Sequence, residues 1–486
     1  MAHSVPDDAV AKPAHDGPAL PPAVSLAIIA LLALLILYVV PRPVGTTIQA
    51  WRMLAIFLCT VLALMLRPIP GGAAVFIGVM STVLTGVLRL PQALASYGSG
   101  TAWLVLAAFF IARALINTGL ARRIALIFVR AMGHTSLGLG YSLVASDMVL
   151  AGIIPANSAR VGGVILPITR TLAVIYESLP GPRAALLGTF LMLTIYQGDV
   201  VACAMFFTGQ ASNPIAARLA QQTAKVGISW STWLTVALVP GLVAAIAVPW
   251  VIYRISPPGI RHTPQAAALA RRELAAMGPM SRHEKIALSV FVLVCGLWAT
   301  SLLHGLEATT VALLGVGILL ATKALPWGDA IREHDAWDIF IWYGGLIGMG
   351  EAISDFGLTT AFARWVSGHF AGWTWPAMMA VVVLIYFFSH YAFASITTHF
   401  ISMYAPFVAV LLAAGAPPPL VAYAMIFYTN LSASLTHYGT TPAPMVFAAG
   451  YVSHGHWWKI GLIVALVNLT IWSAVGLLWW RIIGLW

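Results

Sequence analysis

The stretch IIPANSARVGGVILPI, residues 153–168, brings polar and conformationally restrictive residues into an otherwise apolar chain. It contains an amide, a hydroxyl, a guanidinium, two prolines and two adjacent glycines: Asn157, Ser158, Arg160, Pro155, Pro167, Gly162 and Gly163. Polar groups that leave water need hydrogen-bond partners, because an unpaired buried polar group is costly. How these polar residues find hydrogen-bond partners therefore determines how the chain is folded.

The composition indicates a membrane protein. The 486 residues are 60% hydrophobic and only 8% charged, and the mean hydropathy is +0.91. A soluble protein of this length needs a more charged surface. Apolar runs such as 24–40 and 103–120 are long enough to cross a hydrocarbon core at about 1.5 Å per residue. About a dozen such runs occur, so we predict an all-α polytopic membrane protein.

The distribution of charge predicts the orientation of the chain. The longest hydrophilic interval, residues 253–285, carries six Arg or Lys against two Asp or Glu. Arg122, Arg123 and Arg130 form a second basic patch. Basic loops are retained in the cytoplasm, so we predict both to be cytoplasmic. The tail, residues 1–22, is expected to be disordered, and the first apolar run after it is expected to be a retained helix.

Several classes of function are not supported by the sequence. The net charge of +10 lies mostly in short loops beside apolar runs, and no basic cluster alternates with aromatics, so no nucleic-acid partner is expected. Cys59, Cys203 and Cys295 have no ligand-like spacing, so no metal site is expected. Walker, GxGxxG, HExxH and GxSxG patterns are missing. We therefore expect neither an enzyme nor an ATP-driven pump, and no cofactor.

The chain contains two related halves. The segment ANSARVGGVILPI (156–168) aligns without gaps on SITTHFISMYAPF (395–407). The alignment places three pairs of residues together: Ser158 with Thr397, Arg160 with His399, and Pro167 with Pro406. Each segment is followed by an apolar run that ends in a second polar interruption, at 208–220 and at 436–450. Two structural repeats are predicted, although the alignment does not show their relative orientation.

The four interruptions indicate broken helices. In a bilayer, irregular backbone is tolerated only inside protein or against a watery cavity. The motif at 153–168 therefore suggests a re-entrant hairpin or two half-helices that meet near mid-membrane. Half-helix N-termini attract carboxylates, and free carbonyls attract Na⁺ or protons. The alternative is a Pro/Gly-kinked helix whose hydroxyls bond to its own carbonyls, which explains four matched motifs less well.

The ionisable residues within apolar runs have alternative roles. Arg160 attracts an anionic substrate or caps carbonyls in the hairpin. His399 carries a proton, complements a carboxylate or donates to a backbone carbonyl. Asp147 and Asp199 are costly in lipid, so pairing with a neighbouring helix is favoured over contact with a substrate. His437 is a candidate for lining the site.

The motifs at these positions resemble those of the divalent-anion/sodium symporter family. Its first hairpin tip often reads PSNTAR-GG-PI, which is similar to PANSARVGGVILPI at 155–168. HYAFASITTH (390–399), NLSASLTHYGT (430–440) and the tryptophan-rich end at 457–486 resemble further motifs of one branch. That branch includes citrate/succinate and tartrate/succinate antiporters and plastid-type 2-oxoglutarate/malate translocators. The resemblance extends from about residue 50 to the C-terminus.

The resemblance implies an architecture. The family has two inverted repeats, about 11 transmembrane helices, two re-entrant hairpins and a homodimer, and its transport domain moves as an elevator. It implies a multi-pass protein of the bacterial cytoplasmic (inner) membrane. Applied to this chain, it assigns these segments: scaffold, 23–135 and 221–373; transport domain, 136–220 and 374–450; hairpins, 136–177 and 374–411; broken helices, 184–215 and 417–450; final helix, 451–486.

The resemblance also implies a binding site for organic dianions such as succinate, malate, 2-oxoglutarate, tartrate or citrate. Substrate carboxylates would contact the two hairpin tips and the two helix breaks, through these residues: Asn157, Ser158, Ser395, Thr397, Asn213, Pro214, Thr441 and Pro442. Arg160 and His399 would be candidates for charge compensation. No metal ligand is implied.

Two departures from the family pattern bear on the mechanism. Ala156 lacks the hydroxyl that the family places at the first tip, and a lost hydrogen bond is worth about 1 kcal/mol. Ile396 stands where sodium-coupled members place Asn, and it offers no oxygen to Na⁺. Exchange of one dicarboxylate for another is therefore favoured. The alternatives are Na⁺- or H⁺-coupled symport, with Na⁺ as coupling ion, a passive channel, and a membrane enzyme using His390, His399 and His437.

Overall fold

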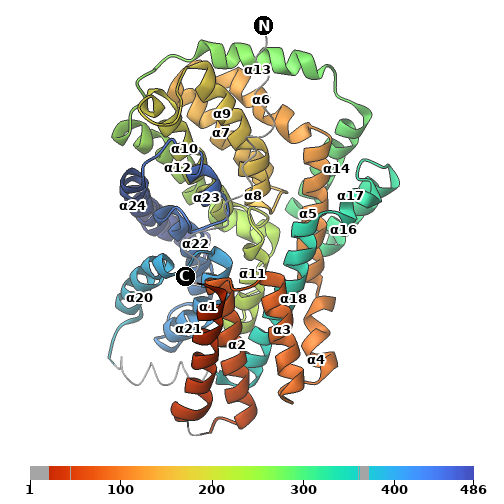
Figure 1. Cartoon of the computed structure of the whole chain (residues 1–486), viewed down its shortest axis with the longest axis vertical. Helices are drawn as coiled ribbons and strands as arrows, with labels where there is room; N and C mark the ends of the chain where they lie inside the picture. Colours follow the sequence, from red (N-terminus) through yellow and green to blue (C-terminus); the bar gives the residue numbers. More distant parts are fainter. Residues whose placement is uncertain (1–20, 44, 359–360, 362–371) are drawn as a thin grey trace.

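The computed structural model describes residues 21–43, 45–358, 361 and 372–486 (Figure 1). Within these residues the regular structure is helical, apart from one isolated bridge between Thr135 and His262. Nine described helices are long and apolar enough to span a membrane, and three more are apolar but shorter. The prediction of an all-α polytopic membrane protein is confirmed. The predicted disordered tail lies outside the described residues, except for Pro21 and Pro22.

The first part of the chain forms six α-helices. They are α1 (Pro22–Leu34), α2 (Ile48–Leu66), α3 (Gly71–Leu84), α4 (Leu90–Leu94), α5 (Gly100–Asn117) and α6 (Leu120–Met132). Only 11% of the apolar window that starts at Pro22 is buried within the protein, whereas 67% of α5 is buried. Because an apolar helix with so little protein contact must be covered by lipid, α1 is peripheral and α5 belongs to the core.

A helix–tip–helix segment follows. It consists of α7 (Ser136–Ala151), α8 (Asn157–Arg160), a π-turn (Val161–Ile165) and α9 (Leu166–Ile175). The π-turn precedes Pro167, which has no N–H for a regular helical bond. At one end the Ser136 N–H donates to Arg261 O at 3.0 Å, and at the other Tyr176 Oη accepts from the Ala266 N–H at 3.0 Å. Both ends therefore lie at one face, as in a re-entrant hairpin.

The next helix is interrupted. Helix α10 (Gly188–Met205) ends at Met205, and α11 (Ser212–Thr223) begins after a short non-helical break. The Asn213 amide donates to Cys203 O at 2.8 Å and to Phe206 O at 2.9 Å, so it replaces backbone donors that the break removes. Because 94% of α10 is buried, this break lies at the centre of the bundle, where α10 packs against α7, α12 and α22.

The second half repeats this order. Helices α20 (Trp375–Ser389) and α21 (Ile396–Ala413) flank a tip, and the Ser395 hydroxyl caps α21 by accepting from the Thr398 N–H. Helix α22 (Pro418–Ser432), a 3₁₀ turn (Ala433–Leu435), a break and α23 (Pro442–Phe447) then follow. Thus the tip and the break of each half fall within the polar motifs at matching places in the sequence.

The remaining helices connect and enclose these segments. They are α12 (Trp230–Ile255), α13 (Pro264–Met277), α14 (Arg282–Ala299), α15 (Ser301–His304), α16 (Ala308–Ala321), α17 (Trp327–Ile331), α18 (His334–Asp355), α24 (His454–Ile471) and α25 (Leu477–Ile482). The hydrophilic interval 253–285 is not simply a loop, because it contains α13, which packs on α6 and crosses the top of the molecule in Figure 1.

The two hairpins start at opposite ends of α12. The first hairpin contacts the chain just beyond Ile255. The ring of Trp375, at the start of the second hairpin, lies 6.1 Å from that of Trp486. Near this C-terminus, Trp479 donates to Thr235 O at 2.8 Å, close to the start of α12. A helix of 26 residues spans about 39 Å, so the hairpins begin at opposite faces, which is the relation that inverted repeats require.

Gly461 on α24 allows a close approach to the second broken helix. A Cβ atom there would lie 2.5 Å from Ser434 O and 2.8 Å from Leu435 O. These are backbone atoms, so relief requires a backbone shift that costs about 1–3 kcal/mol. We expect Gly461→Ala to lower the apparent melting temperature of the purified protein. Gly455→Ala on the same helix is the control, because no atom lies within 4 Å of its added Cβ; an equal effect would contradict the packing explanation.

Candidate functional site

The first hairpin tip meets the second helix break. The Asn157 amide donates to Thr440 Oγ1 at 3.1 Å, and Asn157 Oδ1 accepts from the Thr441 hydroxyl at 3.0 Å. Asn157 and Thr440 are buried, Ser158 is partly exposed and Thr441 is exposed. The break also places Pro442 at the first position of α23, where its missing N–H removes no helical bond. We call Asn157, Ser158, Thr440 and Thr441 the tip–break joint.

A second polar network lies at the first break. The Asn430 amide on α22 donates to Asn213 Oδ1 at 3.0 Å, while Asn430 Oδ1 accepts from the Gln210 amide. Gln210 also donates to the Ser212 hydroxyl at 2.6 Å. These four side chains are buried. Each of these side-chain amides therefore forms a hydrogen bond with another buried amide. The bonds tie the break between α10 and α11 to the second broken helix.

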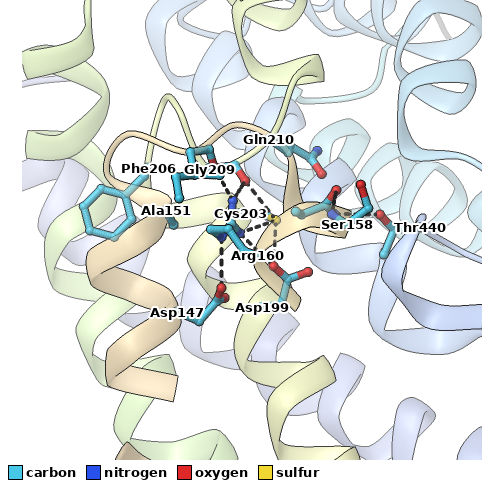
Figure 2. Close-up of polar contacts among 12 residues, drawn as sticks. Asp147, Ala151, Ser158, Arg160, Asp199, Cys203, Phe206, Gly209, Gln210 and Thr440 are labelled. Carbon is cyan, nitrogen blue, oxygen red and sulfur yellow. Dashed lines mark hydrogen bonds and ion pairs between the residues drawn. The ribbon is translucent and has the colours of Figure 1, made fainter. Parts of the chain in front are cut away.

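Arg160 holds the first tip to the first break. Its Nη1 donates to Ile154 O at 2.6 Å, ahead of the tip, and to Gly209 O at 2.5 Å, in the break. Its Nε and Nη2 donate to the carboxylates of Asp147 at 2.9 Å and Asp199 at 2.7 Å. Figure 2 shows the guanidinium between Asp147, Asp199 and Gly209. One side chain thus joins α7, the tip, α10 and the break.

This arrangement decides between the alternatives for Arg160. The guanidinium is fully buried and is occupied by two carbonyls and two carboxylates. It caps carbonyls in the hairpin, and its charge is balanced within the protein. Asp147 and Asp199 are likewise paired inside the bundle, with a residue of a neighbouring segment. The structure therefore does not support charge compensation of a substrate by Arg160.

The second tip is stabilised mainly by histidines. His399 is buried, and its Nε2 lies 3.2 Å from Tyr386 O and 2.9 Å from Ser389 Oγ. A carbonyl only accepts, so Nε2 carries a proton and donates to the backbone. His390 Nε2 donates in the same way to Gly439 O in the second break, at 2.9 Å. Both rings therefore fix the backbone, and His399 is not positioned to compensate a substrate charge.

The structure brings together some of the predicted site residues and leaves others apart. Asn157 bonds to Thr441, and Ser158 follows Asn157 in the sequence. Asn213 and Pro214 lie at the start of α11, in the other network. Ser395 and Thr397 are partly buried at the start of α21, and α21 packs against α11. Between these last two hydroxyls and the tip–break joint, no direct hydrogen bond occurs within the described part of the chain.

Several residues of the two networks were missed by sequence reasoning. They are Thr440, Gln210, Ser212 and Asn430. All four lie within or beside the motifs TGQASNP (208–214) and NLSASLTHYGT (430–440), so their polarity inside apolar runs was an available signal. The pairing itself was not available, because Asn157 and Thr440 are 283 positions apart.

The tip–break joint places two hydroxyls, those of Ser158 and Thr441, at accessible positions, and the Thr441 hydroxyl donates to Asn157 Oδ1. Amide and hydroxyl groups bind carboxylate oxygens without requiring a cation. In the described residues, no group of three or more His, Cys, Asp or Glu side chains is arranged to hold a metal ion. The hydroxyl and amide groups of the joint come from both halves of the chain and are of the kind that hydrogen-bond to polar or anionic molecules.

Comparison with known proteins shows the family of the chain. The model of the sodium:sulfate symporter transmembrane region matches residues 23–486. The chloroplastic dicarboxylate transporter 1 of Arabidopsis thaliana is 42% identical over 455 residues, covering 93% of this chain and 82% of that protein. The citrate/succinate antiporter of Escherichia coli (strain K12) is 31% identical over 475 residues, covering 93% and 96%.

A solved structure shares the fold. The crystal structure of the Alcanivorax borkumensis YdaH transporter superimposes with a TM-score of 0.55 and 14% identity, covering 95% of this chain and 97% of that one. The family and these relatives are transporters, which excludes the alternative of a membrane enzyme. The chain is thus a multi-pass membrane transporter that belongs to the sodium:sulfate symporter family, the divalent-anion/sodium symporters whose motifs its sequence carries.

Proposed function

We propose that this protein carries organic dicarboxylates across the membrane by exchanging one for another. The observation that carries the proposal is the tip–break joint, where amide and hydroxyl groups from both halves of the chain meet beside the accessible Ser158 and Thr441. Relatives named as a dicarboxylate transporter and a citrate/succinate antiporter support this class of substrate. Ser158 and Thr441 would bind one carboxylate, with Asn157 holding them in place, and Ser395 and Thr397 would contribute from the second tip.

Exchange is favoured over sodium symport by the side chains at the tips. Ile396 is buried at the second tip and Ala156 at the first, and neither offers an oxygen ligand beyond its backbone. A sodium ion prefers a shell of oxygen ligands, so both tips provide fewer than Ser and Asn would. The alternative to exchange is Na⁺- or H⁺-coupled symport of the same substrates.

The proposed mechanism is an elevator movement within a homodimer. Residues 136–220 and 374–450 would form the moving transport domain, and residues 23–135 and 221–373 the scaffold. This division is supported by the buried networks that join the two hairpins to the two broken helices. Such networks keep the segments together as one body while it moves. The proposed location is a bacterial cytoplasmic membrane.

The proposal is tested by uptake of labelled succinate into proteoliposomes in four arms. Vesicles contain or lack internal succinate, and each is assayed under a sodium gradient and in sodium-free potassium buffer. Exchange predicts uptake that requires internal dicarboxylate and is indifferent to sodium. Uptake into empty vesicles that follows the sodium gradient would establish symport instead. If no arm shows uptake, malate, 2-oxoglutarate, tartrate and citrate are tested in the same design, and failure of all would refute dicarboxylate transport.

Ser158→Ala and Thr397→Ala are expected to abolish uptake at low substrate concentration. Each removes a hydroxyl that we propose to bind a carboxylate, and a hydrogen bond to a charged group is worth about 1.5–3 kcal/mol, or roughly 10- to 150-fold in affinity. The amount of folded protein should not change. Thr171→Ala is the matched control, because this exposed hydroxyl lies in the same hairpin and donates to Pro167 O. Unchanged uptake in both site variants would refute the site.

A further inference from the structure

A groove with one polar and one apolar end lies between α14 and α16. Its volume is about 460 Å³. Arg282, Lys285, Ser289 and Thr322 line it, together with apolar side chains that include Ile286 and Leu293. The groove takes no part in the tip–break joint or in the buried networks. It thus combines donors suited to an anion with an apolar lining.

The two ends of the groove lie at different depths. Arg282 and Lys285 belong to the first turn of α14, just after the hydrophilic segment that separates it from α12. Leu293 follows about two to three turns later, roughly 12–16 Å further along the helix axis. The cationic end therefore lies at the membrane boundary, and the apolar end lies at the depth of the hydrocarbon.

The basic side chains at this face outnumber the carboxylates that pair with them. Among the described residues, neither Arg282 nor Lys285 has a carboxylate oxygen within 4.0 Å. Arg123, by contrast, makes a buried ion pair with Glu284 at 2.7 Å. A neighbouring hollow of about 400 Å³ between α6 and α13 adds Arg130 and Arg271, which are exposed and equally unpaired with carboxylates. This membrane face therefore presents a concentrated positive charge.

The apolar end opens onto surface that faces lipid. Val292 and Leu293 on α14 are 60% and 39% exposed, and Leu313 and Leu314 on α16 are 42% and 47% exposed. In a bilayer, such surface is covered by acyl chains or by another protein. A molecule with an anionic head and acyl chains matches both ends of the groove at once, whereas a free anion matches only one.

We propose that this groove is a binding site for an anionic phospholipid. The phosphate would lie against Arg282 and Lys285, with Ser289 as a hydroxyl donor, and an acyl chain would follow Ile286 and Leu293 into the membrane. Each Lys or Arg near a membrane surface contributes about 1 kcal/mol to attraction of anionic lipid. Replacing both cations should therefore weaken binding by about thirty-fold.

The test uses the full-length protein in nanodiscs of phosphatidylcholine into which phosphatidylglycerol is titrated. Native mass spectrometry counts the retained phosphatidylglycerol, and the melting temperature reports its effect on stability. For the wild-type protein we expect one retained lipid and a rise in melting temperature. The double variant Arg282→Gln/Lys285→Gln should need about thirty times more phosphatidylglycerol for the same lipid retention and the same rise in melting temperature. It should melt like the wild type in pure phosphatidylcholine, because both side chains are exposed.

Two controls distinguish other occupants. Lys225→Gln removes an exposed cation near the opposite end of α12, and it should retain the lipid like the wild type. Inorganic phosphate at matched ionic strength should not displace the lipid; displacement would show a site for free anions and overturn the proposal. Equal lipid retention by wild type and double variant would also overturn it. If the double variant changes the oligomeric state and leaves lipid retention unchanged, the groove is a contact between copies of this chain and the proposal is overturned.

Discussion

Replacing Arg160 with glutamine is expected to remove most of the folded protein from the membrane. The guanidinium is 0% exposed, and its carboxylate partners Asp147 and Asp199 are 2% and 0% exposed. The variant would leave both carboxylates buried without a cation, and breaking a buried pair in this way costs about 3–5 kcal/mol. It would also release the Ile154 and Gly209 carbonyls. Such a loss is a large part of the stability of a typical protein.

The prediction is measured as the yield of monodisperse protein after detergent extraction and as its melting temperature. Arg183→Gln is the matched control: its pair with Glu177, at 2.8 Å, has side chains that are 62% and 76% exposed, and exposed pairs contribute little. The triple variant Arg160→Met/Asp147→Asn/Asp199→Asn should recover much of the loss, because it removes all three charges. Normal yield and melting temperature for Arg160→Gln would show that the buried cluster does not hold the hairpin.

Replacing Asn157 with alanine is expected to raise the KM for dicarboxylate uptake by roughly 10- to 100-fold. Asn157 bonds to both Thr440 and Thr441, so its loss frees two side chains of the proposed site. Two neutral hydrogen bonds are worth about 1 kcal/mol each to stability, which the fold should tolerate. The expected defect is therefore in transport, and the yield of folded protein should stay close to that of the wild type.

Initial rates of uptake across a range of substrate concentrations measure this effect. Asn117→Ala serves as the control, because Asn117 is exposed and donates to Asp329 at 2.9 Å, far from the joint in sequence. Asn157→Asp provides a second comparison: it keeps the shape but adds a negative charge, which should repel a dicarboxylate more strongly than alanine does. A KM that is unchanged in both Asn157 variants would refute the role of the joint.

The sequence predicts where the helices break but not which segments lie against each break. Pro155, Gly162 and the Asn213–Pro214 pair interrupt apolar runs, so local backbone chemistry predicted where helices would break. The identity of each partner depends on contacts between distant segments. Arg160 lies 13 positions from Asp147 and 39 from Asp199, and nothing local distinguishes a carboxylate of the protein from one of a substrate. The role of Arg160 therefore required the structure.

The hydrophilic interval 253–285 illustrates a second limit. Its polarity and charge predicted a loop outside the membrane, but hydropathy does not report secondary structure. The segment AAALARRELAAM (266–277) is rich in strong helix formers, and it forms most of α13. In this case the sequence itself carries the signal for a helix, whereas the packing of α13 on α6 depends on tertiary structure.

The central claim, that a dicarboxylate binds at the tip–break joint, is tested most directly by a cryo-EM map of the protein in nanodiscs with saturating succinate, compared with a map without it. The claim predicts additional density within hydrogen-bond distance of Ser158 Oγ and Thr441 Oγ1, and its loss in the Asn157→Asp variant. Additional density at another place, with the joint unchanged, would contradict the claim.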